Sequence, residues 1–192
     1  MEIGLIAITS YLLGSIPFGF LLTKIFLKKD IRKIGSGNIG ATNVLRTGNK
    51  VIGYSTLILD ILKAVIPILV VKIYFAEFIF ISSLSVFLGH VFPIWLKFNG
   101  GKGVATYVGI LFCINYILGL CFIISWAVVF LISKYSSLSS LLASLLIPVY
   151  QYFFIDSENY YFFIIMFILI FYTHKENIKR LKNNTESKTK IY

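Results

Sequence analysis

The sequence predicts an all-α polytopic membrane protein with seven transmembrane helices, the N-terminus outside and the C-terminus in the cytoplasm. Of its 192 residues, 58% are hydrophobic and only 14% are charged, and the mean hydropathy is +0.87. A soluble domain of this size with so few charges could not cover this much apolar surface. A lipid bilayer is the natural solvent for such a surface. The net charge of +10 lies in short segments between apolar blocks. This pattern is typical of cytoplasmic loops, and it argues against a nucleic-acid partner.

Six apolar blocks follow one another along the chain, at residues 3–27, 51–75, 78–96, 104–133, 138–155 and 160–173. The first is expected to be a retained span, because no basic segment precedes it and no small-residue cleavage site follows it. The fourth block would form a helix about 45 Å long, although the hydrocarbon core is about 30 Å thick. Asn115 and Gly119 lie inside it and predict a break.

Charge indicates how often the fourth block crosses. If it crosses once, Lys134 and the basic tail lie outside while Asp156 and Glu158 lie inside, which inverts the positive-inside rule. If it crosses twice, every basic segment is cytoplasmic. The sequence therefore predicts seven helices, with residues 1–181 as a single transmembrane catalytic domain and residues 182–192 as a polar cytoplasmic tail that is frayed or disordered.

Four unusual segments then share the cytoplasmic side. Residues 35–46 combine three glycines with Ser, Thr and Asn side chains and end in Arg46. Glycines allow backbone N–H groups to converge on an anion, and Arg adds a bidentate clamp for phosphate. A flexible interhelical loop is the alternative, but the density of donors favours an anion site. The spacing also fits a dinucleotide fingerprint, which we reject because no βαβ unit surrounds it and Asp60 lies in an apolar block.

The other three segments carry weaker signals. Residues 97–106 place a Gly-rich turn and Lys102 before a helix start, which is typical of a phosphate site, although a plain interhelical turn fits too. At residues 134–137, helix capping explains the hydroxyls equally well. Residues 174–181 place His174 and Asn177 on one helix face; positive-inside anchoring explains the neighbouring bases but not these two residues.

Polar residues inside the apolar blocks are treated mainly as structural. Asp60 and Lys63 are three residues apart and are expected to pair on one helix face, with a structural role and a direct role equally open. For His90 a helix-packing hydrogen bond is favoured. Cys113 and Cys121 have no metal-ligand spacing and are expected to be packing residues.

Several catalytic signatures are missing from the sequence. It has no nucleophile elbow, no Cys/His nucleophile pair and no cluster of metal-binding carboxylates. What remains is neutral donors, bases and glycines suited to phosphate, and this predicts chemistry that needs no metal, no cofactor and no covalent nucleophile.

Three motifs together resemble those of the acyl-phosphate glycerol-3-phosphate acyltransferase family. They are Ser36-Gly37-Asn38-x-Gly40-Ala41-Thr42-Asn43-x-x-Arg46, Gly100-Gly101-Lys102-Gly103-Val104-Ala105-Thr106 and His174-x-x-Asn177-Ile178-x-Arg180-Leu181. The resemblance implies a seven-span enzyme of the bacterial plasma membrane whose active site faces the cytoplasm. It would transfer an acyl group from acyl phosphate to glycerol 3-phosphate, giving lysophosphatidic acid and phosphate in phospholipid synthesis. It would need no acyl-CoA or acyl carrier protein directly, and its other contacts would be membrane lipids.

The resemblance also implies roles for single residues. The expected catalytic residues are Ser36, Arg46, Lys102, Ser137, His174 and Asn177. The expected phosphate-binding residues are Gly37, Asn38, Thr42, Asn43, Gly100, Gly101 and Gly103, with Asp60, Lys63 and His90 in support. Two departures, Asn99 and Thr173, stand where the family often has a base, so we expect tuned phosphate affinity rather than a changed reaction.

Two rival functions remain open at this point. The first is a transporter or channel for a phosphorylated anion, since basic Gly-rich segments also suit entry into a pore. A transporter requires polar groups near the midplane of the bilayer. In this sequence only Asp60 and Lys63 lie deep in an apolar block. The second rival is a different lipid-phosphate transferase.

Overall fold

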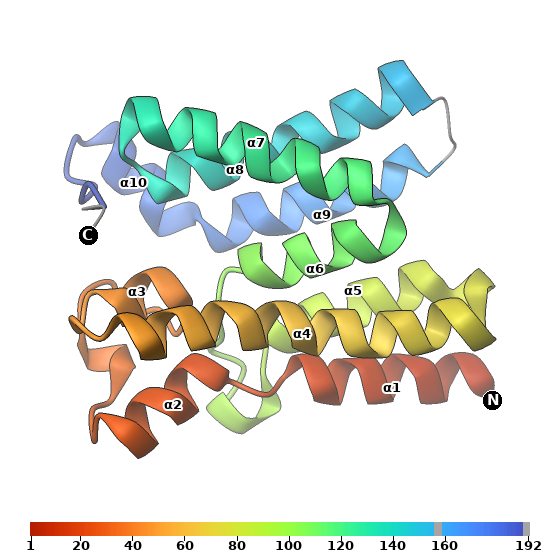
Figure 1. Ribbon diagram of the computed structural model, residues 1–192, viewed down its shortest axis with the longest axis horizontal. Helices are drawn as coiled ribbons and strands as arrows, with labels where there is room; N and C mark the ends of the chain where they lie inside the picture. Colours follow the sequence, from red (N-terminus) through yellow and green to blue (C-terminus); the bar gives the residue numbers. More distant parts are fainter. Residues whose placement is uncertain (156–158, 190–192) are drawn as a thin grey trace. The chain divides into compact units, whose positions relative to one another are not determined.

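The computed structural model describes residues 1–155 and 159–189, and the regular elements of these residues are all helical (Figure 1). The chain divides into two compact units, Met1–Ile114 (unit 1) and Asn115–Tyr192 (unit 2). The predicted outer-loop acids Asp156 and Glu158 lie outside the described residues, as do the last three residues of the tail.

Unit 1 consists of six α-helices and short 3₁₀ turns. The helices are α1 (Glu2–Gly14), α2 (Phe18–Phe26), α3 (Ala41–Leu45), α4 (Lys50–Tyr74), α5 (Ile79–Val91) and α6 (Val104–Ile114), and the turns are Ile31–Lys33, Ala76–Phe78 and Ile94–Leu96. Helix α1 packs on α5, and α4 packs on α1, α2, α5 and α6. Figure 1 shows α4 running beside α1 and α2, which follow each other end to end.

Small residues bring α1 and α5 into close contact. A Cβ at Gly14 would overlap the backbone of Val86, and a Cβ at Gly89 would overlap the carbonyl of Tyr11. The hydroxyls of Ser10 and Ser82 are hydrogen-bonded across the same interface at 2.8 Å. Helices in a membrane typically associate in this way. The hydrophobic effect does not favour their contact in lipid, so close van der Waals packing of the backbones and interhelical hydrogen bonds stabilise it.

Unit 2 contains α7 (Tyr116–Ser133), α8 (Ser136–Tyr150), a π-helical turn (Gln151–Ile155), α9 (Tyr160–Thr173) and α10 (Lys175–Lys182). Helix α8 packs against both α7 and α9. The axis bends by 63° between α9 and α10, at His174. The predicted break in the fourth apolar block is confirmed at Asn115, whose side chain accepts a 2.9 Å bond from Ile117 N and so caps α7.

The protein is an all-α integral membrane protein. Among the described residues, four helical segments are long and apolar enough to cross a bilayer: Glu2–Phe26, Ala76–Leu96, Tyr116–Ser133 and Ser136–Ile155. The bent pair α9 and α10 makes a fifth if it is one span. Helix α6 has 11 residues, about 16 Å of helix, and is too short to cross the hydrocarbon core alone. The number of seven spans stays a prediction.

Candidate active site

Asn43 organises the first Gly-rich loop of unit 1. Its Oδ1 accepts from Ser36 N at 2.9 Å, and its Nδ2 donates to the carbonyls of Ile31, Ile34 and Asn38 at 3.3, 2.9 and 2.8 Å. The residue is only 3% exposed. Since both its polar atoms are engaged inside the loop, Asn43 positions the other donors, and the phosphate contact predicted for it stays a prediction.

The loop reaches this shape through residues in the left-handed region. Gly35 and Gly37 have φ of +55° and +72°, which L side chains rarely adopt. A Cβ on Gly35 would lie 3.3 Å from Arg46 Nη1, so the guanidinium lies over this glycine. Asn38 Oδ1 accepts from Gly40 N at 2.9 Å and tightens the turn before α3. The sequence motif thus encodes a compact loop with Arg46 folded across it.

Three predicted donors of this loop are accessible to solvent. Ser36, Thr42 and Arg46 are exposed, and within residues 1–155 and 159–189 the structure shows no hydrogen bond or ion pair made by their side chains. Arg32 differs, because its guanidinium holds Asp30 through bonds of 2.9 and 2.8 Å. These hydrogen bonds lower the pKa of Asp30 to about 2, so the carboxylate stays charged. The guanidinium of Arg32 is therefore already paired with Asp30. Arg46 is therefore the better-placed guanidinium for an external anion.

The second Gly-rich loop of unit 1 is bonded to the end of α5. Gly100 N donates to the carbonyl of Val91 and Gly101 N to that of His90, both at 3.0 Å. A Cβ on Gly101 would overlap the His90 imidazole. In this conformation Gly100 and Gly101 serve close packing, and their N–H groups are already used. The phosphate-binding role predicted for them stays a prediction.

Donors for an anion in this loop lie further along the chain. The carbonyl of Gly103, whose φ is +84°, accepts from Tyr107 N at 2.7 Å, so α6 begins directly after Gly103. The first N–H groups of a helix have no intrahelical acceptor, and they carry partial positive charge. Lys102, half-buried, precedes them. This arrangement matches the predicted combination of helix N-terminus and lysine.

The two loops of unit 1 share one apolar base. Leu96, at the end of the turn before the second loop, belongs to the same buried cluster as Ile31, Ile39, Val44 and Ile52 around the first loop. The structure thus brings the two predicted anion-binding loops onto a common support.

Elsewhere in unit 1, three buried polar residues connect the helices. Lys63 Nζ lies 2.8 Å from Asp60 Oδ1, as predicted, and also donates to the carbonyl of Ile16 at 2.8 Å. Ile16 lies in the interruption between α1 and α2, before Pro17. His90 Nδ1 lies 3.7 Å from Asp60 Oδ1. The cluster joins α4, α5 and the broken first span, which supports a structural role.

Unit 2 brings Ser137 and Asn177 together around an acidic side chain. Glu186 Oε1 accepts from Ser137 Oγ at 2.7 Å and from Asn177 Nδ2 at 2.6 Å, and its Oε2 accepts from Arg180 Nε at 2.6 Å. Ser137 is the second residue of α8, whose N-terminus adds favourable potential for an anion. Burial raises the pKa of Glu186, but the bonds from Ser137, Arg180 and Asn177 outweigh it, so the pKa is lowered.

Residues 183–189 of the predicted polar tail make backbone hydrogen bonds to other parts of unit 2. Thr185 N donates to the carbonyl of Arg180 at 2.8 Å, and Thr189 N to that of Lys134 at 2.9 Å. Neither the composition nor the motifs point to Glu186, and positive-inside anchoring alone explains the charge of Arg180. The available signal was a lone acid among the bases of the tail, three residues after Asn183, the residue that caps the end of α10.

His174 is held by the helix bend. Its Nδ1 lies 2.8 Å from the carbonyl oxygen of Ile170. A carbonyl oxygen only accepts, so Nδ1 carries the proton and Nε2 carries the lone pair. His174 is 2% exposed and stands at the junction of α9 and α10. The geometry presets one tautomer, as a residue that takes up or orients a proton requires.

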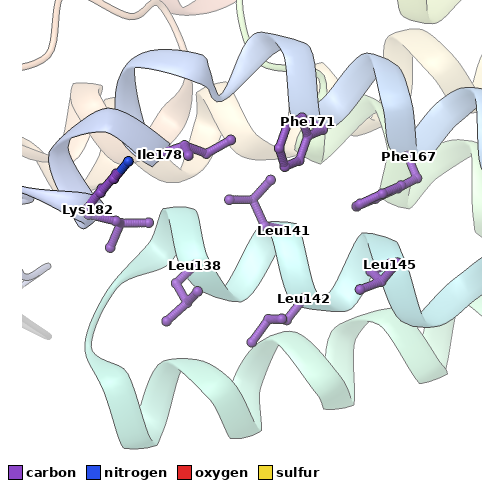
Figure 2. A pocket seen from close by; sticks show the side chains of 9 residues that line it. Leu138, Leu141, Leu142, Leu145, Phe167, Phe171, Ile178 and Lys182 are labelled. Atoms are coloured by element: carbon purple, nitrogen blue, oxygen red, sulfur yellow. The ribbon is translucent and has the colours of Figure 1, made fainter.

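An apolar groove runs along unit 2 beside this polar cluster. It has a volume of about 370 Å³ and is lined by Leu138, Leu141, Leu142, Leu145, Phe167, Phe171, Ile178, Leu181 and Lys182. Figure 2 shows Lys182 at the end near Leu138 and Ile178, with Leu145 and Phe167 at the other end. Leu138 and Ile178 directly follow Ser137 and Asn177 in the chain. The groove therefore suits a chain-like apolar group that starts at an anionic head.

The fold defines a multi-pass membrane protein, with two Gly-rich loops in unit 1 and, in unit 2, a polar cluster next to an apolar groove. The family described as glycerol-3-phosphate acyltransferase matches residues 4–184. The chain belongs to the glycerol-3-phosphate acyltransferase family.

Relatives and solved structures agree with this assignment. A glycerol-3-phosphate acyltransferase of Pelagibacter ubique is 73% identical over 192 residues, the full length of both chains. One from Bartonella henselae is 49% identical and aligns with 96% of this chain and 90% of its own. The crystal structure of PlsY, an integral membrane glycerol 3-phosphate acyltransferase, in its glycerol 3-phosphate form has a TM-score of 0.92 at 36% identity, covering 98% of this chain and 96% of that one. Its lysophosphatidic acid form has a TM-score of 0.88 at 35% identity, with 98% and 95% covered.

Proposed function

We propose that this membrane acyltransferase moves a fatty acyl group from acyl phosphate to the sn-1 hydroxyl of glycerol 3-phosphate. The products are lysophosphatidic acid and phosphate, in the first acylation of bacterial phospholipid synthesis. The observation that carries the proposal is the Ser137–Asn177–Arg180 cluster, which holds an oxyanion at the mouth of an apolar groove. An anion and an apolar chain side by side are what acyl phosphate and lysophosphatidic acid both present.

The proposed topology has seven spans with the N-terminus outside and the C-terminus in the cytoplasm. The helix break at Asn115 supports it, because it divides the longest apolar block into α6 and α7. The basic loops and tail then face the cytoplasm, and so does the active site. In this proposal residues 1–181 are a single transmembrane catalytic domain in the bacterial plasma membrane. Helix α6 is short, so the bilayer thins around it.

We assign the two phosphates to different donors. The acyl-phosphate side uses Ser36, Asn38, Thr42 and Arg46, with Asn43 holding them in place. The helix start at Gly103, together with Lys102, receives glycerol 3-phosphate. Ser137 and Lys102 bridge the two substrates, and His174 and Asn177 orient the attacking hydroxyl. The exposure of Ser36, Thr42 and Arg46 and the fixed tautomer of His174 support these roles.

The reaction requires the enzyme to align the two substrates, and it requires no covalent intermediate with the enzyme. Acyl phosphate is a mixed anhydride, so its phosphate leaves readily once the hydroxyl oxygen attacks the acyl carbonyl. The C–O bond to the glycerol oxygen forms, the bond from the carbonyl to the phosphate oxygen breaks, and the hydroxyl proton passes to His174 Nε2 or to a phosphate oxygen. Lysine and arginine donors stabilise the charge on the oxyanion and the leaving phosphate. The acyl chain lies in the groove of Figure 2.

The test uses purified protein in lipid with labelled glycerol 3-phosphate. Palmitoyl phosphate, palmitoyl-CoA and palmitoyl carrier protein are supplied in separate tubes. We expect labelled lysophosphatidic acid and released phosphate in the first tube alone. Product with CoA or carrier protein would overturn the assigned donor. If folded protein gives no product in any tube, a transporter of phosphorylated anions becomes the leading function, and flux into sealed vesicles decides it.

A further inference from the structure

The second Gly-rich loop of unit 1 lies against one face of α5. A Cβ on Gly101 would overlap Nε2 of the His90 imidazole, and a Cβ on Gly103 would overlap the ring of Phe87. Phe87 and His90 are three residues apart, so their rings share a helix face. Both are buried, at 0% and 3% exposure. The loop approaches α5 this closely because it has no side chains at these two positions.

The imidazole of His90 is what excludes a side chain at position 101. The three atoms nearest to a Cβ on Gly101 all belong to this ring. Gly103 has a φ of +84° that disfavours any side chain, whereas Gly101 does not have a positive φ, so its backbone would accept alanine. Gly101 N also donates to the His90 carbonyl at 3.0 Å. His90 therefore sets the position of Gly101 through both its side chain and its backbone.

Asp60 confines the imidazole on its other side. His90 Nδ1 lies 3.7 Å from Asp60 Oδ1, and Lys63 Nζ lies 2.8 Å from the same carboxylate oxygen. The backbone of Asp60 also contacts the helix that follows the loop, because Thr106 Oγ1 donates to its carbonyl at 3.4 Å. Asp60, His90 and Thr106 are all buried. The loop is thus held at Gly101 and again at Thr106, and both contacts lead to Asp60.

The residues that follow Gly101 are those assigned above to glycerol 3-phosphate. Lys102 is next in the chain, and Gly103 directly precedes α6, whose first N–H groups have no intrahelical acceptor. A shift of Gly101 shifts these groups as well, because they are directly joined to it. A misplacement of about 1 Å at a bound substrate can cost about 100-fold in rate. The contact of His90 with Gly101 therefore bears on substrate binding, although Gly101 N itself is bonded to His90.

We propose that His90 is a positioning residue for glycerol 3-phosphate: its imidazole sets the position of Gly101 and so places Lys102 and the N-terminus of α6 where the substrate phosphate binds. The proposal rests on the role given above to Lys102 and to this helix start. A purely structural His90 would affect stability alone. A positioning His90 affects the KM for glycerol 3-phosphate more strongly than the KM for acyl phosphate, because the acyl phosphate is assigned mainly to the first loop.

The test is a double-variant cycle of Gly101→Ala, His90→Ala and the two together. Binding of labelled glycerol 3-phosphate is measured without an acyl donor, and the KM for each substrate is measured with one. We expect Gly101→Ala to weaken binding about 10- to 100-fold, because the methyl group pushes the loop away from the ring. His90→Ala should weaken it less. In the double variant the methyl group enters the space left by the ring, and we expect binding at least about threefold tighter than in Gly101→Ala.

Two controls accompany the cycle. Gly4→Ala adds the same methyl group where a Cβ meets nothing within 4 Å, and it should behave as wild type. Unfolding in detergent shows that each variant is folded. Asp60 keeps Lys63 as its partner in His90→Ala, so this variant leaves no unpaired carboxylate and decides the question even if Gly101→Ala does not fold.

Binding needs no turnover, so it separates this proposal from the proposed reaction. If the double variant recovers binding but no donor supports acyl transfer, the positioning role holds and the reaction is wrong. If acyl transfer proceeds while the double variant binds no better than Gly101→Ala, the positioning role is overturned, because the methyl group then acts by another route. A folded His90→Ala with wild-type binding and wild-type KM for glycerol 3-phosphate overturns it as well.

Discussion

Lys63 Nζ lies 2.8 Å from Asp60 Oδ1 within α4, and the same ammonium donates to the Ile16 carbonyl at the interruption of the first span. Both charged residues are buried. We predict that Lys63→Met lowers the free energy of unfolding by about 3–5 kcal/mol, because it leaves a buried carboxylate unpaired. Denaturant or thermal unfolding in detergent measures this. Lys50→Met, at the exposed start of α4, is the control and should change little.

The double variant Asp60→Asn/Lys63→Met separates pairing from packing. If the loss in Lys63→Met comes from an uncompensated charge, removing the partner charge restores part of the stability. A double variant as unstable as Lys63→Met, or less stable, contradicts the assigned pairing.

Asn43→Ala tests the organisation of the first loop. Its Nδ2 donates to three carbonyls and its Oδ1 accepts from Ser36 N, so the substitution leaves several buried groups unpaired, at about 1–3 kcal/mol each. We predict faster deuterium uptake at residues 31–46 and a steep loss of acyl transfer. Asn99→Ala, in an exposed turn, is the control and should leave uptake at 31–46 unchanged. A loop that stays protected in Asn43→Ala would show that Asn43 does not organise it.

Helix breaks and buried pairs were within reach of the sequence, whereas contacts of single polar side chains were not. The break at Asn115 was predicted because a side-chain amide inside a long apolar run has few roles other than a helix cap. The Asp60–Lys63 pair was predicted because two opposite charges inside a membrane span pair with each other. The interruption before Pro17 was missed, since the run 3–27 looks continuous in hydropathy.

The candidate site divides in the same way. Motifs identified the loops, but spacing does not say which donors of a motif are consumed internally, as at Asn43, Gly100 and Gly101. Glu186 was missed because composition makes residues 183–189 look disordered, and only three-dimensional convergence shows that its carboxylate has a binding site.

Arg46→Lys should damage acyl transfer severely. The guanidinium lies over Gly35 at the edge of the loop and is not paired with an acid in the described parts of the chain, and Lys cannot reproduce its bidentate fork. We predict a loss of about 1.5–3 kcal/mol of transition-state binding, roughly 10- to 150-fold in kcat/KM. Arg32→Lys, at an arginine already held by Asp30, should lose far less. A near-normal kcat/KM in Arg46→Lys would contradict the assignment.

The contacts of Glu186 with Ser137, Asn177 and Arg180 should open at acid pH. The pKa of Glu186 is lowered in the folded protein, because its hydrogen bonds outweigh burial, and Arg180 is the charged group that contacts it. A lowered carboxyl pKa contributes stability that is present above the ordinary pKa of 4.5 and is lost as pH falls through the folded value. We therefore predict that protection of residues 183–189 holds from neutral pH down to about 4.5 and disappears below it. NMR or deuterium uptake corrected for intrinsic exchange measures this, and Glu186→Gln should show no such pH dependence.

His174→Gln tests which group accepts the hydroxyl proton. The bond between His174 Nδ1 and the Ile170 carbonyl places the lone pair on Nε2, the state a general base requires. If Nε2 takes the proton, we predict that the rate falls about 10²- to 10⁴-fold and that the acid limb of the pH–rate profile disappears. His90→Gln is the control, since His90 lies beside Asp60 in the structural cluster and should affect stability rather than the profile. A His174→Gln enzyme that keeps more than about 5% of the rate with an unchanged profile would assign the proton to a phosphate oxygen, because a general base contributes far more than that.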